Sequence, residues 1–195
     1  MIIRNIWAIG RNYADHAKEL GNEIPSEPLI FLKAGSCVVQ TTEVVLPAWT
    51  VEVHHEVELA LQFDERLEVH KAAVALDLTE RHFQNQLKAK GSPWTLAKSF
   101  TGACPLSSFF AVDTISELKN LDILLSVNGQ LRQKGNTSQM IFSIDQQLEY
   151  IKEHFPVCPG DLLLTGTPAG VGPLQRGDLT LAEIPGKVRH EWTLR

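Results

Sequence analysis

The 195-residue sequence predicts an α+β fold. Many short apolar runs have the length and composition of strands, only a few segments show helical spacing, and the two kinds do not alternate as in a βαβ protein. No internal repeat, low-complexity stretch or linker divides the chain, so we expect one domain over residues 1–195. Hydrophobic residues make up 44% of the sequence, enough for a core of ordinary size.

Charge and composition exclude several classes of protein. The 18 Lys and Arg against 23 Asp and Glu give a formal net charge of -5, which predicts no binding to nucleic acid or to an anionic membrane. No apolar run approaches the ~20 residues of a membrane span, and the first residues lack a signal-peptide pattern. The three cysteines are widely spaced and predict neither disulfides nor a zinc ribbon. We therefore expect a cytoplasmic protein.

The first elements are a strand, a short helix and a second strand. Residues 2–9 are predicted to be a strand that Gly10 ends. Residues 13–20 contain good helix formers and are followed by a Gly-Asn stop at 21–22, so a short helix is expected there. After a proline-containing loop, residues 29–32 form a short apolar strand.

The middle of the chain alternates between extended segments and one helix. Residues 44–46 and 51–63 are predicted to be extended, and within the second segment odd-numbered and even-numbered side chains point to opposite faces. Residues 72–78 form a plausible buried strand. A helix over residues 81–90 follows and ends at Gly91.

Stronger local signals mark the last third. Asn128-Gly129 between residues 123–127 and 130–132 is the clearest hairpin signal in the chain. Residues 143–155 are the best helix, because a serine cap precedes apolar side chains at helical spacing. Residues 162–164 form a strand that leads into a Gly- and Pro-rich loop over residues 165–173.

Three carboxylates lie in unusually apolar surroundings. Glu56 and Glu58, at i and i+2, project from one face of the predicted strand, and Asp77 lies inside the run Val-Ala-Leu-Asp-Leu. An unpaired buried charge is costly, and a hard divalent cation such as Mg²⁺ or Mn²⁺ prefers carboxylate ligands. The alternative is a solvated strand face, which is common for such a spacing. The carboxylates predict a candidate metal site.

Other residues could bind an anion or move a proton. His16 has Glu19 at i+3 on one helix face, and a carboxylate beside an imidazole is typical of a general base as well as of ordinary helix surfaces. Lys33 and Lys98 lie in apolar segments, where each could extend its stem to solvent or bind an anionic substrate. Loop 165–172 offers backbone N–H groups for a carboxylate but lacks the lysine of a P-loop. The histidines at 54, 55, 70 and 82 show no zinc spacing.

Eight segments, in this order, resemble the fumarylacetoacetate hydrolase family, and most closely its small single-domain branch of acylpyruvate hydrolase and oxaloacetate decarboxylase type. Together they extend over essentially the whole chain. They are GRNYADHAKE at 10–19, SEPLIFLK at 26–33, HHEVEL at 54–59, ALDLTER at 75–81, PWTLAKSF at 93–100, VNGQLRQ at 127–133, MIFSI at 140–144 and GDLLLTGTPAGVGP at 160–173.

The resemblance implies a mixed β-sheet roll with a few peripheral helices, commonly a homodimer. It implies that the three carboxylates bind Mg²⁺ or Mn²⁺ and that a small 2-oxo acid is the substrate. It assigns further residues to the site as follows: Lys98 beside the metal, His16 and Glu19 as the acid/base dyad on a segment that closes over the ligand, Thr167 on the substrate carboxylate, and Arg11, Lys33 and Gln84 in the pocket wall.

The implied activity is Mg²⁺-dependent hydrolysis of a C–C bond in acylpyruvates or related β-diketo acids, through a metal-chelated pyruvate enolate. Decarboxylation and keto–enol tautomerisation of oxaloacetate are alternatives, because they pass through a similar enolate on a nearly identical site. The connection between Glu58 and Asp77 is shorter than is usual in the family. This departure motivates a third hypothesis, a catalytically silent ligand-binding relative.

Overall fold

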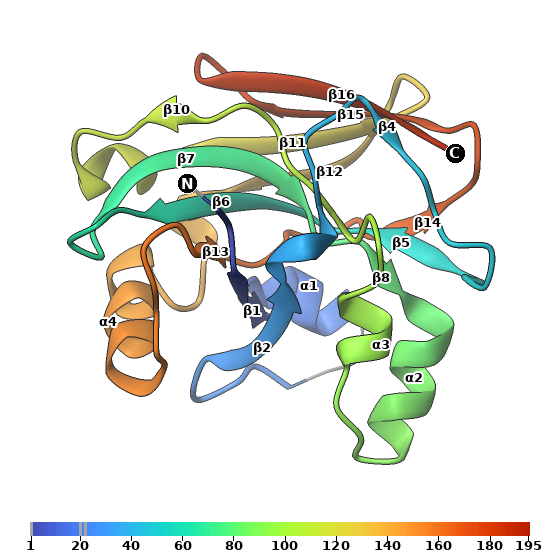
Figure 1. Ribbon diagram of the computed structural model, residues 1–195, viewed down its shortest axis with the longest axis horizontal. Helices are drawn as coiled ribbons and strands as arrows, with labels where there is room; N and C mark the ends of the chain where they lie inside the picture. The colour runs from blue at the N-terminus through green and yellow to red at the C-terminus, as the bar shows by residue number, and fades with distance from the viewer. Residues whose placement is uncertain (1, 20, 22) are drawn as a thin grey trace.

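The computed structural model describes residues 2–19, 21 and 23–195 of the chain. Its centre is a six-stranded mixed sheet with the strand order β10-β7-β6-β13-β1-β2 (Figure 1). Strand β1 runs parallel to β13, and the other neighbours in this sheet are antiparallel. The strands are β1 (Asn5–Gly10), β2 (Leu29–Ala34), β6 (Val57–Phe63), β7 (Val69–Leu76), β10 (Phe110–Ala111) and β13 (Leu162–Leu164).

A second sheet of five strands packs over the first, with the order β12-β11-β15-β16-β4. Figure 1 shows it lying above β6 and β7, which β11, β15 and β16 contact. Its strands are β4 (Glu43–Val44), β11 (Asp122–Val127), β12 (Gln130–Asn136), β15 (Leu179–Ile184) and β16 (Val188–Leu194). Two small sheets complete the roll: β14 (Gly172–Leu174), β5 (Val53–His55) and β8 (Thr79–Glu80), and the pair β3 (Val38–Val39) with β9 (Cys104–Pro105).

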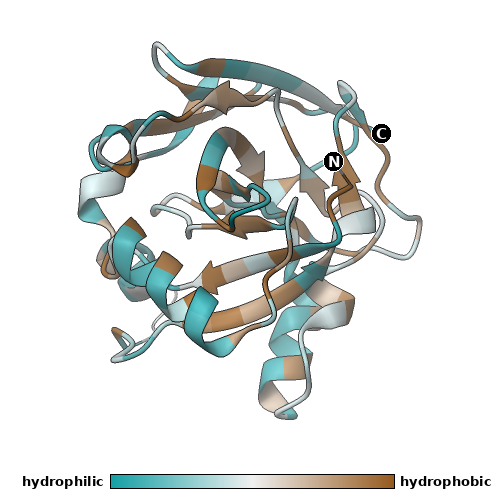
Figure 2. Ribbon diagram, turned by 60° about the vertical axis from the view of Figure 1, so that its left-hand side comes forward, coloured by the Kyte–Doolittle hydropathy of each residue, from teal (hydrophilic) through white to brown (hydrophobic). Residues whose placement is uncertain are grey.

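The helices lie at the periphery of the sheets. Helices α2 and α3 contact each other at one end of the molecule, and α4 lies at the other (Figure 1). Hydrophobic residues colour the central strands in Figure 2, whereas the helices alternate between hydrophobic and hydrophilic faces, as amphipathic elements do. The α-helices are α1 (Ala14–Glu19), α2 (Arg81–Ala89), α3 (Thr95–Lys98) and α4 (Ile144–His154), and short 3-10 turns are Gly35–Cys37, Ile115–Leu118 and Thr137–Gln139.

Most predicted elements are present with shifted ends. The first strand begins at Asn5 rather than at residue 2, β7 begins at Val69, and the strand predicted over 44–46 is reduced to β4. The short helix predicted over 13–20 is α1, although Leu20 and Asn22 lie outside the described residues. The predicted α+β class and the mixed-sheet roll are confirmed.

The extended segment predicted over residues 51–63 forms two strands, β5 and β6, which are divided at Glu56, and every residue of β6 is buried. The second sheet covers one side of β6, and on the cavity side Glu56 and Glu58 are only 5% and 2% exposed. The alternative of a solvated carboxylate face is thereby excluded.

Among the described residues, no helix is long and apolar enough to cross a membrane.

Candidate metal centre and active-site cavity

The β6–β7 hairpin brings the three carboxylates together. Glu58 on β6 is paired with Ala75 on β7, which places Asp77 just beyond the paired end of the hairpin. The Asp77 N–H donates to the backbone carbonyl of Glu56 over 2.8 Å, so the chain segments bearing these two residues are directly joined. One oxygen from each of the three carboxylates lies within 4.8 Å of the others, and all three residues are buried. The short connection between Glu58 and Asp77 therefore does not misplace the aspartate.

The three carboxylates have unequal partners. Glu56 accepts hydrogen bonds from the Arg81 guanidinium and, over 2.8 Å, from the Lys98 ammonium. Asp77 accepts from Lys33 over 2.6 Å and from Lys98 over 2.5 Å. Among the described residues, Glu58 accepts a hydrogen bond only from the Gly166 N–H, over 2.6 Å. It thus has no cation in direct contact.

This difference sets the protonation of the two glutamates. Burial alone would raise the pKa of Glu56, but the charges of Lys98 and Arg81 outweigh it and hold the pKa well below its usual range. Burial raises the pKa of Glu58 well above its usual range, and the charges of Asp77 and Glu56 raise it further. A buried set of hard oxygen ligands with one uncompensated carboxylate fits Mg²⁺ or Mn²⁺.

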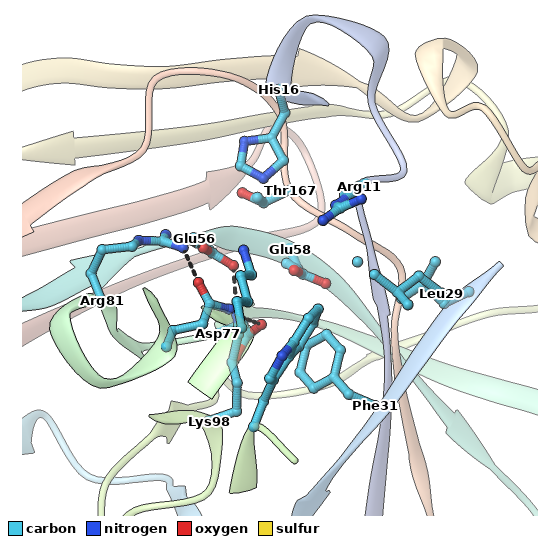
Figure 3. A pocket seen from close by; sticks show the side chains of 15 residues that line it. Arg11, His16, Leu29, Phe31, Glu56, Glu58, Asp77, Arg81, Lys98 and Thr167 are labelled. Atoms are coloured by element: carbon cyan, nitrogen blue, oxygen red, sulfur yellow. Dashed lines mark hydrogen bonds and ion pairs between the residues drawn. The ribbon is translucent and has the colours of Figure 1, made fainter. Parts of the chain in front are cut away.

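The three carboxylates line one cavity of the structure. Figure 3 shows His16 and Thr167 on one side of them, and Arg81 and Lys98 on the other. Arg11 lines the same cavity from the segment after β1. The backbone of Arg11 has a φ of 59°, a conformation that residues other than glycine rarely adopt. Such backbone conformations occur often at functional sites.

The predicted acid/base residues lie close together on α1. His16 Nδ1 is 3.7 Å from Glu19 Oε2, which is ion-pair distance but too long for a hydrogen bond. Instead, Glu19 accepts from the Gly170 N–H over 3.0 and 3.2 Å. Burial lowers the pKa of His16 below its usual value, although the negative charges of Glu56 and Glu19 act to raise it. The imidazole is therefore neutral at physiological pH and able to accept a proton.

Lys33 and Lys98 occupy different positions relative to the cavity. The sequence predicts Lys33 in the pocket wall, but its ammonium is fully buried behind Asp77, where it also donates to the Leu78 carbonyl over 3.4 Å. Lys33 does not line the cavity. Lys98 does, and its three donors are directed to Glu56, Asp77 and, over 2.6 Å, the Thr79 hydroxyl.

The Gly-rich loop and Gln84 also differ from expectation in detail. The sequence predicts that the loop offers N–H groups to a substrate carboxylate, but the N–H groups of Gly166 and Gly170 bind Glu58 and Glu19 of the protein itself. Thr167 of this loop does face the cavity. Gln84 lines it too, and accepts from Arg81 Nη1 over 2.5 Å.

Sequence reasoning missed two residues that organise the site. Arg81, in the quoted segment ALDLTER, received no role, although its placement three residues before Gln84 at the start of a helix puts both on one face. Gln133 on β12 is buried and donates to Thr167 Oγ1 over 2.8 Å and to the Pro168 carbonyl over 2.9 Å. It also accepts from the Val57 N–H, so it ties the Thr167 loop to β6. Gln133 ends the quoted segment VNGQLRQ, but the sequence analysis gives it no role.

The histidines at 54, 55, 70 and 82 do not gather into a metal site within the described part of the chain, where the carboxylates form the three-ligand group. His55 is buried, with Nδ1 2.9 Å from Gln133 Oε1.

The family model for the fumarylacetoacetate (FAA) hydrolase C-terminal region matches residues 5–194. The chain is 44% identical to the mitochondrial oxaloacetate tautomerase of Bos taurus, covering 94% of this chain and 88% of that protein. It is also 44% identical to the mitochondrial oxaloacetate decarboxylase of Dictyostelium discoideum, covering 94% and 89%. The fumarylpyruvate hydrolase of Pseudomonas aeruginosa, solved with Mn²⁺ and pyruvate, is 31% identical over 98% of this chain and 89% of that one, with a TM-score of 0.92.

Proposed function

The chain belongs to the fumarylacetoacetate hydrolase family, and from that premise we propose that it catalyses the keto–enol tautomerisation of oxaloacetate, with decarboxylation of oxaloacetate as a second reaction of the same site. The observation that carries the proposal is one buried cavity in which the three carboxylates, His16 and Arg11 come together. The sequence favours acylpyruvate hydrolysis and gives the oxaloacetate reactions as alternatives. Two relatives at 44% identity are named for oxaloacetate, which favours the alternatives.

Glu56, Glu58 and Asp77 would hold the Mg²⁺ or Mn²⁺ ion. When bound, the ion would supply positive charge where negative charge develops on the 2-oxo group of the substrate. Lys98 holds Glu56 and Asp77 in place through its ammonium, while Lys33 fixes Asp77 from behind. The ligand side chains are thus oriented before a substrate arrives, which reduces the reorganisation needed during the reaction.

The other cavity residues bind the substrate and move its proton. Arg11 supplies a guanidinium and Thr167 a hydroxyl, groups that bind a carboxylate. In the forward tautomerisation one proton leaves C3 of the keto acid and one arrives on the C2 oxygen. We assign the acceptance of the C3 proton to His16, a role supported by its lowered pKa and its position in the cavity wall. Glu19 beside it stabilises the protonated imidazole.

A substrate panel with and without divalent cation tests the proposal. The decay or growth of the ultraviolet absorbance of enol oxaloacetate measures tautomerisation, and a lactate dehydrogenase couple measures pyruvate release. We expect tautomerisation to require Mg²⁺ or Mn²⁺ and to be lost in EDTA. A rate above the buffer background that persists fully in EDTA would refute the metal-dependent mechanism, and no turnover of oxaloacetate would refute the assignment.

Hydrolysis of acylpyruvates is the second candidate, favoured by one specific observation. The His16–Glu19 pair is an arrangement suited to activating water, which hydrolysis requires and tautomerisation does not. The 31% identical fumarylpyruvate hydrolase provides independent support. Acetylpyruvate and fumarylpyruvate therefore belong in the panel, and faster cleavage of either than turnover of oxaloacetate would favour this candidate. Turnover of any of these acids would also exclude a silent ligand-binding relative.

We further propose a homodimer, which light scattering after size-exclusion chromatography would test. The cytoplasmic location stays a prediction from the sequence, whereas the two curated relatives are both named as mitochondrial. Fractionation of cells that express the full chain would distinguish the two compartments.

A further inference from the structure

One face of α2 supplies three polar side chains to the cavity. Arg81, Gln84 and Lys88 follow one another at i, i+3 and i+7, a spacing that places them on one side of the helix. A rise of about 1.5 Å per residue puts Lys88 about 10 Å along the axis from Arg81, toward the outer part of the cavity. Helical side chains lean toward the N-terminus of their helix, so Lys88 leans back toward the carboxylates.

Among the described residues, Lys88 differs from Arg81 and Lys98, the cavity cations that lie against the carboxylates, in having no acidic partner. Arg81 and Lys98 both contact Glu56, and Lys98 also contacts Asp77. Within the part of the chain that the structure describes, the Lys88 ammonium makes no hydrogen bond or ion pair, although the residue is half-buried. A half-buried ammonium that faces a cavity and lacks a protein partner is a site for a ligand anion.

Aromatic side chains hold this ammonium in place. Lys88 Nζ lies 5.2 Å from the centroid of the Trp94 ring, and Trp94 in turn packs against Phe31 with ring centroids 5.7 Å apart. Leu29, Phe31 and Trp94 all line the same cavity. This apolar wall reduces hydration around the ammonium and therefore strengthens its attraction for an anion. Without the charge of Lys88, the same wall would favour an apolar group.

We propose that Lys88 binds the carboxylate of the substrate that lies farther from the metal site, and so makes the cavity selective for dicarboxylic over monocarboxylic 2-oxo acids. The proposal rests on the proposed function and adds the residue that distinguishes oxaloacetate from a substrate with one carboxylate. Lys88 acts in binding and takes no part in the proton transfer assigned to His16.

The acidity of Lys88 supports this role. Burial, together with the positive charges of Arg81, Arg11 and Lys98, lowers its pKa to about 8 against the opposing attraction of Glu56. These groups face Lys88 from its own helix, the segment after β1, α3 and the end of β5. The ammonium is charged below that pKa, so the preference for dicarboxylates is present at neutral pH and falls as the pH rises above about 8.

Malate and lactate form a matched pair of probes, because they differ by one carboxylate and neither carries the 2-oxo group that reacts. Calorimetric titration of each into the Mg²⁺-loaded protein gives the ratio of the two affinities. In Lys88→Met, which keeps the apolar stem and removes the charge, we expect the preference for malate to fall about tenfold to a hundredfold. Lys88→Arg should retain most of it.

Lys90→Met is the matched control, because it removes the same charge from the exposed C-terminal end of the same helix. The proposal is overturned if Lys88→Met weakens malate and lactate equally, or if Lys90→Met lowers the ratio as much as Lys88→Met does. Oxaloacetate turnover is measured in parallel. Absence of turnover in the wild-type protein would refute the proposed function, while the malate-to-lactate ratio would still decide the role of Lys88.

Discussion

Replacing Glu58 by Gln should stabilise the metal-free protein, whereas the same replacement at Glu56 should destabilise it. Both side chains are buried and only two residues apart. Glu56 contacts two cations, but among the described residues Glu58 accepts a hydrogen bond only from the Gly166 N–H. Glutamine retains an oxygen that can accept that bond while removing a charge that has no counter-ion.

The size of the stabilisation expected from Glu58→Gln follows from the pH dependence of stability. The pKa of Glu58 is raised well above 4.5 in the folded protein, so the folded state holds the proton more tightly than the unfolded state. The stability that this group contributes is complete below about pH 4.5 and is lost as the pH rises through the folded-state pKa. Within that window the loss is about 1.4 kcal/mol per pH unit, or about 3–5 °C in Tm for a chain of this size. Glu58→Gln removes this loss.

Glu56→Gln should have the opposite effect for an electrostatic reason. The pKa of Glu56 lies well below its usual range, and its loss leaves Arg81 and Lys98 without a charged partner in a buried place. Breaking one side of a buried ion pair costs about 3–5 kcal/mol. Glu149→Gln, on the exposed side of α4, controls for the removal of one negative charge far from the cavity.

Thermal unfolding followed by circular dichroism in EDTA, from about pH 5 to pH 8, measures these differences. Addition of Mg²⁺ to about one hundred times its Kd should then stabilise the wild-type protein by about 2.7 kcal/mol, and Glu58→Gln by less. The reasoning is refuted if Glu58→Gln lowers the metal-free Tm across the whole range, if its advantage does not grow with pH, or if it responds to Mg²⁺ like the wild type.

Three further outcomes follow from the geometry. His16→Ala should reduce acylpyruvate hydrolysis more than oxaloacetate decarboxylation, because only hydrolysis needs an activated water. Gly166→Ala should destabilise the fold by about 1–3 kcal/mol, since Gly166 has a φ of +100° and an added Cβ would lie 2.6 Å from the Cβ of Asn12. Inserting two glycines into the turn at residues 64–68 should cost less than about 1 kcal/mol and leave Mg²⁺ stabilisation intact, because that turn is remote from the paired end of the hairpin.

Each of these has a control and a contradicting result. Equal losses of both reactions in His16→Ala would mean that the imidazole serves a step common to them. For Gly166→Ala, urea unfolding is compared with Gly177→Ala, which shares a positive φ but has open space around its Cβ. Loss of the Mg²⁺ response after the glycine insertion would show that the length of the connection, and not the strand register, positions the aspartate.

Elements with strong local signals could be predicted from the sequence. Asn128 and Gly129 both have positive φ, 51° and 76°, as their turn between β11 and β12 requires. Ser143 accepts from the Gln146 N–H at the start of α4, as a serine cap does. The hairpin of β15 and β16 is not predicted, because the half-exposed face of β15 carries Leu179 and Leu181 while its buried face carries Thr180, so apolar alternation does not mark the buried side. Four residues are too few for α3 to show helical spacing.

The residue types of the site could be predicted from the sequence, but the ion pairs between its carboxylates and its cations could not. The Glu-Val-Glu motif and Asp77 indicate a metal site because carboxylates in apolar segments are rare. The difference between Glu56 and Glu58 depends on Arg81 and Lys98, which lie 25 and 42 residues beyond Glu56. No local pattern indicates which of two neighbouring carboxylates such residues will reach. The position of Lys33 behind Asp77 depends in the same way on the packing of β2 against the site.

The register of the β6–β7 hairpin explains how the short connection between Glu58 and Asp77 builds the site. Glu58 lies opposite Ala75, so Asp77 must emerge beside the backbone of Glu56, whatever the length of the turn at the other end. A slip of one residue would turn every side chain of β7 to the opposite face, which a sheet buried on both sides does not tolerate. The register therefore gathers three negative charges, and Lys33, Arg81 and Lys98 reach only two of them. If Glu58 had a lysine of its own, the cluster would be a complete ion-pair network with little affinity for a metal. Because it has none, a divalent cation gains both the ligands and the remaining charge that binding requires.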